Sequence, residues 1–148
     1  MLLTGAEIAD FLPHQAPMIL IDQIVKADEH SLIGRIESHR APSHPLRIRG
    51  SLPAISAIEM AAQGCAIHGA LRTPSTASGS RPGVLALIKD ISWNHPTLDE
   101  VEGALELEVL KLHGDSHKAF YQFKLTANSG LLVEGDLAVF FMEKKDSL

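Results

Sequence analysis

The sequence has a single cysteine, and this scarcity excludes several kinds of site. Cys65 has no partner for an internal disulfide, and there is no cluster of cysteines that could bind a metal ion. Its apolar neighbours predict a small buried thiol. The only tryptophan, Trp93, is likewise expected to pack in the core. The chain also lacks a long basic run and has a formal net charge of -5, so non-specific binding to nucleic acid is not expected.

The sequence also shows no pattern typical of a secretion signal or of a membrane span. The opening stretch, MLLTGAEIAD, contains neither a basic segment nor a long apolar one. The apolar stretch from Leu52 to Leu71 has about the length of a bilayer span, but Glu59, Gln63 and His68 interrupt it. Because other segments show amphipathic strand patterns, we interpret this stretch as a buried helix and expect a cytoplasmic protein.

What the sequence does contain predicts one α+β domain over residues 1–148. A short helix at about residues 4–11 is followed by candidate strands at residues 18–27 and 31–38, a loop, and the apolar helix. After a segment rich in Ser, Thr and Pro at residues 72–83, apolar residues alternate in four further strands. Short turns between strands favour an antiparallel sheet, and a helix that is apolar on all sides needs that sheet wrapped around it.

The apolar helix carries one carboxylate, Glu59, in its middle. Ser51 is placed to cap the helix, and Pro53 fits its first turn. Ser56, Glu59 and Gln63 are spaced so that they share one helix face. Two interpretations are open. Either Gln63 or a backbone amide satisfies a structural carboxylate, or Glu59 is a buried group suited to proton exchange near neutral pH.

Histidines near this carboxylate are candidates for the same chemistry. His44 lies fifteen residues upstream (59 − 44), in the loop that leads into the helix. It can therefore approach Glu59 of the same subunit or of a second one. His39 is the competing candidate. His68 lies about half a turn out of phase with Glu59 and is not expected to be its partner.

Several stretches together resemble a known family, the hot-dog-fold 3-hydroxyacyl-[acyl-carrier-protein] dehydratases. FLPHQAPMILIDQIV is similar to the family's opening turn and strand, and LPAISAIEMAAQG to its central helix with the catalytic acid. LIKDISWNHP and GALELEVLKL are similar to two later strands. HPL, IEMAAQ and HGAL are more similar still to the dehydratase-like proteins of aryl polyene and xanthomonadin-type pigment pathways. The loop SHPLRIRGSL departs from the family's His-Phe-Pro-Gly loop, and Ala54 replaces a glycine.

The resemblance implies a fold, an activity and a site. The fold is the hot-dog fold, an antiparallel β-sheet wrapped around a long central α-helix. The activity is dehydration of 3-hydroxyacyl thioesters on acyl carrier protein to trans-2-enoyl thioesters, in fatty-acid or aryl polyene-type lipid biosynthesis, without a cofactor or a metal. His44 is implied as the base for the C2 proton, and Glu59 as the group that serves the C3 hydroxyl. Substrate contacts are implied at Gln63, at Leu87 and Ile88, and at His14, for which a structural role in the LPHQ turn is the preferred interpretation. Backbone amides near the helix start, or those of Leu87 and Ile88, could hold the thioester oxygen.

The resemblance also implies partners. We expect a homodimer or a dimer-based oligomer in which His44 and Glu59 of one site come from different subunits. A heterodimer with another hot-dog protein is the alternative. The acyl carrier protein is acidic, so the arginines that flank the helix (Arg47, Arg49 and Arg72) are candidates for docking it, or else they simply solubilise the surface.

Two other functions fit the same residues. An acyl thioesterase of this fold would use the helix carboxylate to activate water and would not need His44. A non-catalytic hot-dog subunit would bind acyl chains or stabilise a partner enzyme, and the altered His44 loop keeps this alternative open.

Overall fold

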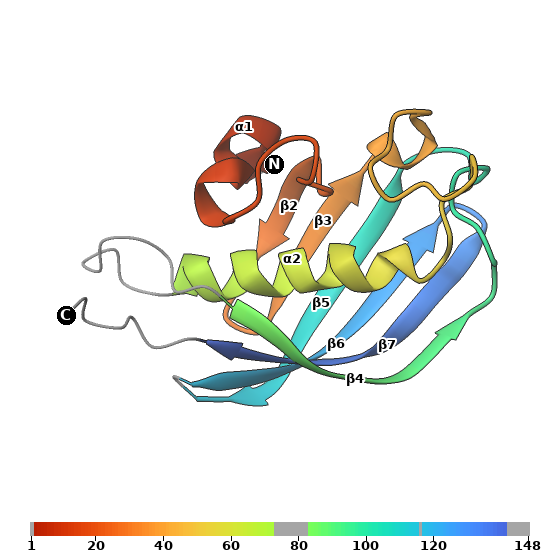
Figure 1. The fold of residues 1–148 in the computed structure, drawn as a ribbon. Helices are drawn as coiled ribbons and strands as arrows, with labels where there is room; N and C mark the ends of the chain where they lie inside the picture. The colour runs from red at the N-terminus through yellow and green to blue at the C-terminus, as the bar shows by residue number, and fades with distance from the viewer. Residues whose placement is uncertain (1, 73–82, 116, 142–148) are drawn as a thin grey trace.

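Helix α2 (Ser56–Arg72) lies across one face of an antiparallel sheet, as Figure 1 shows. The computed structural model describes residues 2–72, 83–115 and 117–141. Within these ranges the strand order is β1-β2-β3-β5-β6-β7-β4. The other elements are β1 (Leu3–Thr4), α1 (Gly5–Ile8), η1 (Ala9–Phe11), β2 (Gln23–Ala27), β3 (Ser31–Ile36), η2 (Ser38–Arg40), β4 (Gly83–Trp93), β5 (Leu105–Gly114), β6 (Lys118–Ala127) and β7 (Gly130–Phe141).

The predicted order of elements is confirmed, with small changes in their bounds. A short N-terminal helix, two strands, the apolar helix and four strands follow one another, and β1 is an additional strand of two residues. Residues 18–22 lead into β2 but do not belong to it. In the described ranges no helix is both long enough and apolar enough to cross a membrane.

The start of the central helix differs from the prediction. Ser51 does not cap α2 and Pro53 does not lie in its first turn, because the helix begins at Ser56. The carboxylate of Asp99 instead accepts hydrogen bonds from the Ser51 hydroxyl (3.2 Å) and from the Leu52 amide (2.8 Å). The segment before the helix is therefore held against residues 96–99, where Pro53 forms a bridge with Thr97.

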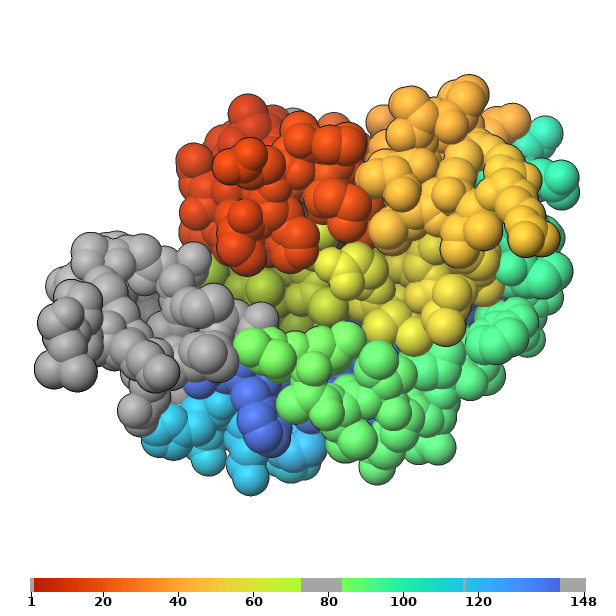
Figure 2. Space-filling view, in the orientation of Figure 1, coloured from red at the N-terminus to blue at the C-terminus, as the bar shows by residue number. Residues whose placement is uncertain are grey.

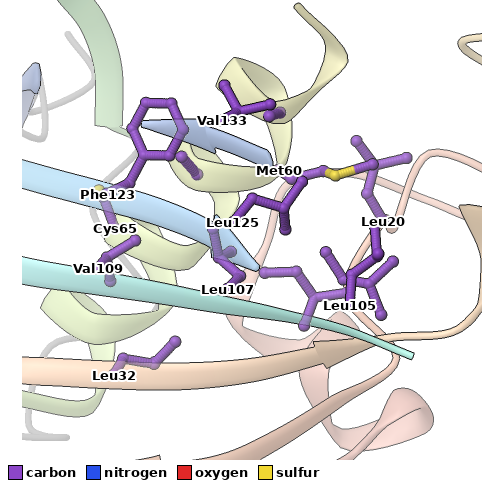
Figure 3. Packing of buried hydrophobic residues seen from close by; sticks show 14 of the residues in the cluster. Leu20, Leu32, Met60, Cys65, Leu105, Leu107, Val109, Phe123, Leu125 and Val133 are labelled. Carbon is purple, nitrogen blue, oxygen red and sulfur yellow. The ribbon is translucent and has the colours of Figure 1, made fainter. Parts of the chain in front are cut away.

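One side of α2 is packed tightly on the sheet. A Cβ atom at Gly64 would lie 3.2 Å from side-chain atoms of both Leu107 and Val109, so glycine allows the helix to approach β5 closely. Met60 and Cys65 lie among the buried side chains of the sheet (Figure 3). The predicted buried thiol is confirmed, and burial raises the pKa of Cys65 far above its ordinary value.

The opposite side of α2 is only partly covered by the described residues. Figure 2 shows the helix exposed between the N-terminal segment (red) and β4 (green). We call this surface the open stripe of α2, and its half-buried residues are Ile58, Glu59, Ala62, Ala66 and Ala70. The stripe consists of small or apolar side chains apart from one carboxylate.

Strand β4 forms the free edge of the sheet beside this stripe. Among the described residues it pairs only with β7, and it exposes Leu87, Ile88 and Trp93 to between 43% and 52%. The prediction that Trp93 packs in the core is therefore wrong. A long apolar edge strand is a surface that proteins usually cover, because its unpaired backbone groups and apolar side chains favour association.

Candidate active site

Glu59 lies in the first turn of α2, on the open stripe. Its side chain keeps 39% of its exposure, and His14 Nε2 lies 3.3 Å from Glu59 Oε1. The contact becomes an ion pair when His14 is protonated. A negative charge in the first turn also interacts favourably with the helix dipole, by about 0.3–1 kcal/mol. Within the single chain the carboxylate is therefore not enclosed as the sequence predicted, and a histidine stands beside it.

The preferred interpretation of His14 was a structural role in its turn. The contact with Glu59 is additional to that role. His14 belongs to the loop that follows η1, and its side chain is 31% exposed. Its Nδ1 atom is buried without a hydrogen-bond partner in the described part of the chain. Apart from the LPHQ motif, nothing in the sequence indicated that His14 contacts Glu59, the only carboxylate of α2.

Gln63 holds the segment that follows His14. Its side-chain Nε2 donates to the Met18 carbonyl (2.7 Å), and its Oε1 accepts from the Leu20 amide (2.9 Å). Gln63 is 1% exposed, and both ends of its amide are engaged with backbone. Gln63 thus has a structural role, and the predicted substrate contact at Gln63 stays a prediction. Because both ends of its amide are engaged in this way, Gln63 does not satisfy the carboxylate of Glu59.

We expect Gln63→Leu to lower the free energy of unfolding by about 2–4 kcal/mol, because it leaves the Met18 carbonyl and the Leu20 amide without a partner. Chemical denaturation measures the change. The control is Gln122→Leu on β6, which lies between the buried Tyr121 and Phe123 and so points to the other face of the sheet. It should change stability by less than about 0.5 kcal/mol. Equal effects of the two substitutions would contradict the role of Gln63.

His44 is nearly buried, with 6% exposure, in the loop between η2 and the start of α2. Its Nδ1 accepts a hydrogen bond from the Leu46 amide at 3.1 Å. Its Nε2 is buried and has no partner among the described residues. Burial, followed by the positive charge of Arg47, lowers the pKa of His44 below its ordinary value, and Asp22 opposes this shift. The ring is therefore held neutral near pH 7.

Arg47 fastens this loop from inside. Its guanidinium donates to the carbonyls of Ala41 (2.8 Å), Gly50 (2.7 Å) and Arg40 (2.9 Å). The side chain is 16% exposed. Three of its N–H groups are engaged within the loop and the side chain is mostly buried, which leaves little of Arg47 for the predicted docking of an acidic carrier protein. Arg49 and Arg72 are exposed and keep that prediction.

We expect Arg47→Met to speed amide hydrogen exchange of residues 40–50 at least about tenfold, because it removes three charge-assisted hydrogen bonds worth about 1.5–3 kcal/mol each. Exchange read by mass spectrometry measures this. Arg40→Met, at an exposed arginine that ends η2 just before this loop, is the matched control and should leave exchange unchanged. Similar exchange in both variants would show that Arg47 does not fasten the loop.

The other buried histidines have structural partners. His39 Nε2 donates to the Val101 carbonyl at 2.9 Å. His68 Nε2 donates to the Asp28 carbonyl at 2.9 Å, and its Nδ1 is 2.7 Å from the hydroxyl of Tyr121. No partner for His68 could be predicted, since Tyr121 lies on a strand far along the chain.

The predicted contacts at Leu87 and Ile88 fall on the edge strand. Their side chains are 46% and 43% exposed. A role for them in substrate binding stays a prediction. Within residues 2–72, 83–115 and 117–141, no group of three or more His, Cys, Asp or Glu residues could hold a metal ion.

Solved structures with the same architecture define the class of this fold. The dehydratase heterocomplex ApeI:P from Xenorhabdus doucetiae aligns with a TM-score of 0.83 and 21% identity, over 94% of this chain and 93% of that one. The phenylacetic acid degradation protein PaaI from Thermus thermophilus aligns with a TM-score of 0.58 and 12% identity, over 81% and 92%. A hypothetical thioesterase from Streptococcus pneumoniae aligns with a TM-score of 0.58 and 11% identity, over 82% and 90%. The predicted hot-dog fold is confirmed.

A family model narrows the class further. The model for ApeP-like proteins, described as ApeP dehydratase, matches residues 6–148. The chain belongs to the ApeP-like dehydratase family, as the resemblance of its motifs predicted. A search of curated protein sequences found no match.

Proposed function

We propose that this ApeP-like dehydratase removes water from a 3-hydroxyacyl thioester carried on acyl carrier protein, giving the trans-2-enoyl thioester in aryl polyene-type lipid biosynthesis. Membership of the dehydratase family supports the reaction class. The observation that carries the assignment is the contact of Glu59 with His14, at 3.3 Å, on the open stripe of α2. Both side chains are partly exposed, His14 to 31% and Glu59 to 39%, which supports a site that a substrate can reach.

The reaction sets demands that these residues can meet. The C3 hydroxyl needs a proton in order to leave, the C2 proton needs a base, and the thioester oxygen needs a donor as enolate charge develops on it. Glu59 exchanges a proton with the hydroxyl, and His14 holds the carboxylate in place. His44 acts at the thioester end of the same substrate.

A second hot-dog chain completes the site in this proposal. The open stripe of α2 and the apolar edge β4 lie next to each other, and a partner that covers them would exclude water from Glu59. His44 would then face a Glu59 that belongs to the other chain. The similar ApeI:P structure is a dehydratase heterocomplex, which supports a hot-dog partner for this chain too. Arg49 and Arg72 remain available to dock the acidic carrier protein.

We expect Glu59→Gln to lower turnover at least about 100-fold, because general acid–base assistance contributes about 10²–10⁴. The assay incubates the purified chain, alone and co-expressed with a second hot-dog dehydratase, with 3-hydroxyacyl carrier protein and follows loss of water by mass spectrometry. Glu102→Gln, an exposed carboxylate away from α2, is the control and should keep full turnover.

The products of this assay distinguish the other functions. Release of a free acid in place of an enoyl thioester would identify a thioesterase. A complex that keeps full turnover when this chain carries Glu59→Gln would identify a non-catalytic subunit. Either result would contradict the proposed dehydration at Glu59.

We expect Ile88→Glu to weaken the complex, because a charge on the edge strand opposes pairing with another chain. Size-exclusion chromatography with light scattering should show a shift towards the single chain. Val25→Glu on β2 is a matched control, since Val25 and Ile88 are both 43% exposed on strands of the same sheet. If both variants keep the same assembly, β4 is not the interface.

A further inference from the structure

The hydrogen bonds of His44 determine which of its nitrogens carries the proton. Leu46 donates its backbone N–H to His44 Nδ1 at 3.1 Å. A ring nitrogen can accept a hydrogen bond only through a lone pair, so Nδ1 is unprotonated. A neutral imidazole has one N–H group. The proton of His44 is therefore on Nε2.

This Nε2–H group is buried without an acceptor in the described part of the chain. An unpaired buried donor costs about 1–3 kcal/mol. The other buried imidazoles in the described ranges differ in this respect. His39 Nε2 donates to the Val101 carbonyl, and His68 Nε2 donates to the Asp28 carbonyl. Of the three buried histidines, His44 is the one whose N–H has no acceptor in these ranges.

The surroundings keep this ring neutral. Burial and the adjacent guanidinium of Arg47 both lower the pKa of His44. Arg47 cannot easily move away, because three backbone carbonyls bind it. Asp22, which acts in the opposite direction, has its Oδ2 engaged with the amides of Glu37 (2.6 Å) and Ser38 (3.0 Å). His44 is thus presented as a neutral donor.

We propose that His44 is a hydrogen-bond donor to the thioester oxygen of the substrate, through Nε2–H, and is not the base that removes the C2 proton. This assignment rests on the proposed dehydration. It replaces the role that the family resemblance implied for His44. A neutral imidazole can polarise a carbonyl in this way while it keeps its own proton.

The step balances with Glu59 as the only proton carrier. The Glu59 carboxylate takes the C2 proton, and the electron pair of the C2–H bond moves towards the thioester oxygen, where His44 Nε2–H stabilises the enolate. The enolate then forms the C2=C3 double bond as the C3–O bond breaks. The departing hydroxyl takes the proton from Glu59 and leaves as water, and both residues return to their starting states.

Two substitutions at His44 test the assignment through turnover. His44→Leu removes the donor and should lower turnover about 10²–10³-fold, the usual loss for one oxyanion donor. His44→Gln presents an amide N–H near the same place but cannot act as a base at neutral pH. It should stay within about tenfold of the unaltered enzyme. If both variants lose turnover equally, while thermal unfolding shows that both are folded, His44 is the base and the proposal is overturned.

A measurement on the unaltered chain is independent of any variant. Nitrogen-15 chemical shifts and long-range proton–nitrogen couplings distinguish the two neutral tautomers of histidine. We expect the Nε2–H form for His44 at pH 7.5. An Nδ1–H form in an active enzyme would overturn the donor role alone. Absence of dehydration by the chain and by its complex would overturn the proposed function, and the donor role with it.

Discussion

The side-chain amide of Gln63 is the contact on which the geometry of the site depends. It joins the middle of α2 to the backbone at Met18 and Leu20, on the segment that leads from His14 into β2. Gln63 lies one turn along the helix from Glu59, so the same turn of α2 that presents the carboxylate also anchors the loop that presents the imidazole. A buried amide that is hydrogen-bonded at both ends fixes the orientation of the loop relative to the helix as well as the distance between them. An apolar contact would not fix the orientation.

The order of elements could be predicted because it follows from local patterns. Alternating apolar residues define β5, β6 and β7, and the continuous apolar run defines α2. The start of α2 could not be predicted in this way. Ser51 and Pro53 have the local chemistry of a helix start, but Asp99, 48 residues further along (99 − 51), binds the Ser51 hydroxyl and the Leu52 amide instead. A tertiary hydrogen bond overrides a local capping signal.

The candidate site was predicted unevenly for a related reason. Glu59 is conspicuous because it is a charge in an apolar helix. The roles of Gln63 and Arg47 depend on hydrogen bonds to backbone carbonyls and amides. No sequence pattern indicates which backbone groups a side chain will reach. From the sequence, a glutamine near a candidate catalytic acid and an arginine near a candidate catalytic histidine are both expected to contact a ligand. In the structure both are committed to the backbone of their own chain, and they act on the site by holding loops in place.

The buried histidines and the partly exposed Glu59 differ in how far the single chain determines their surroundings. His39 lies in η2 and His44 in the loop that follows it, and backbone groups hold both in the Nε2–H form. The Val101 carbonyl accepts the proton of His39 Nε2, and the Leu46 amide donates to His44 Nδ1. His39 uses its N–H within the fold, whereas the N–H of His44 has no acceptor in the described ranges. These states are set by the fold of a single chain and need no substrate.

Glu59, in contrast, is still 39% exposed, so its environment would change if a partner covered the open stripe. In the proposed mechanism, the donor is thus prepared before assembly, whereas the proton carrier would acquire its final surroundings only when a partner covers the stripe. An enzyme arranged in this way couples its chemistry to association, because desolvation strengthens the electrostatic interactions of a carboxylate only after water has been excluded.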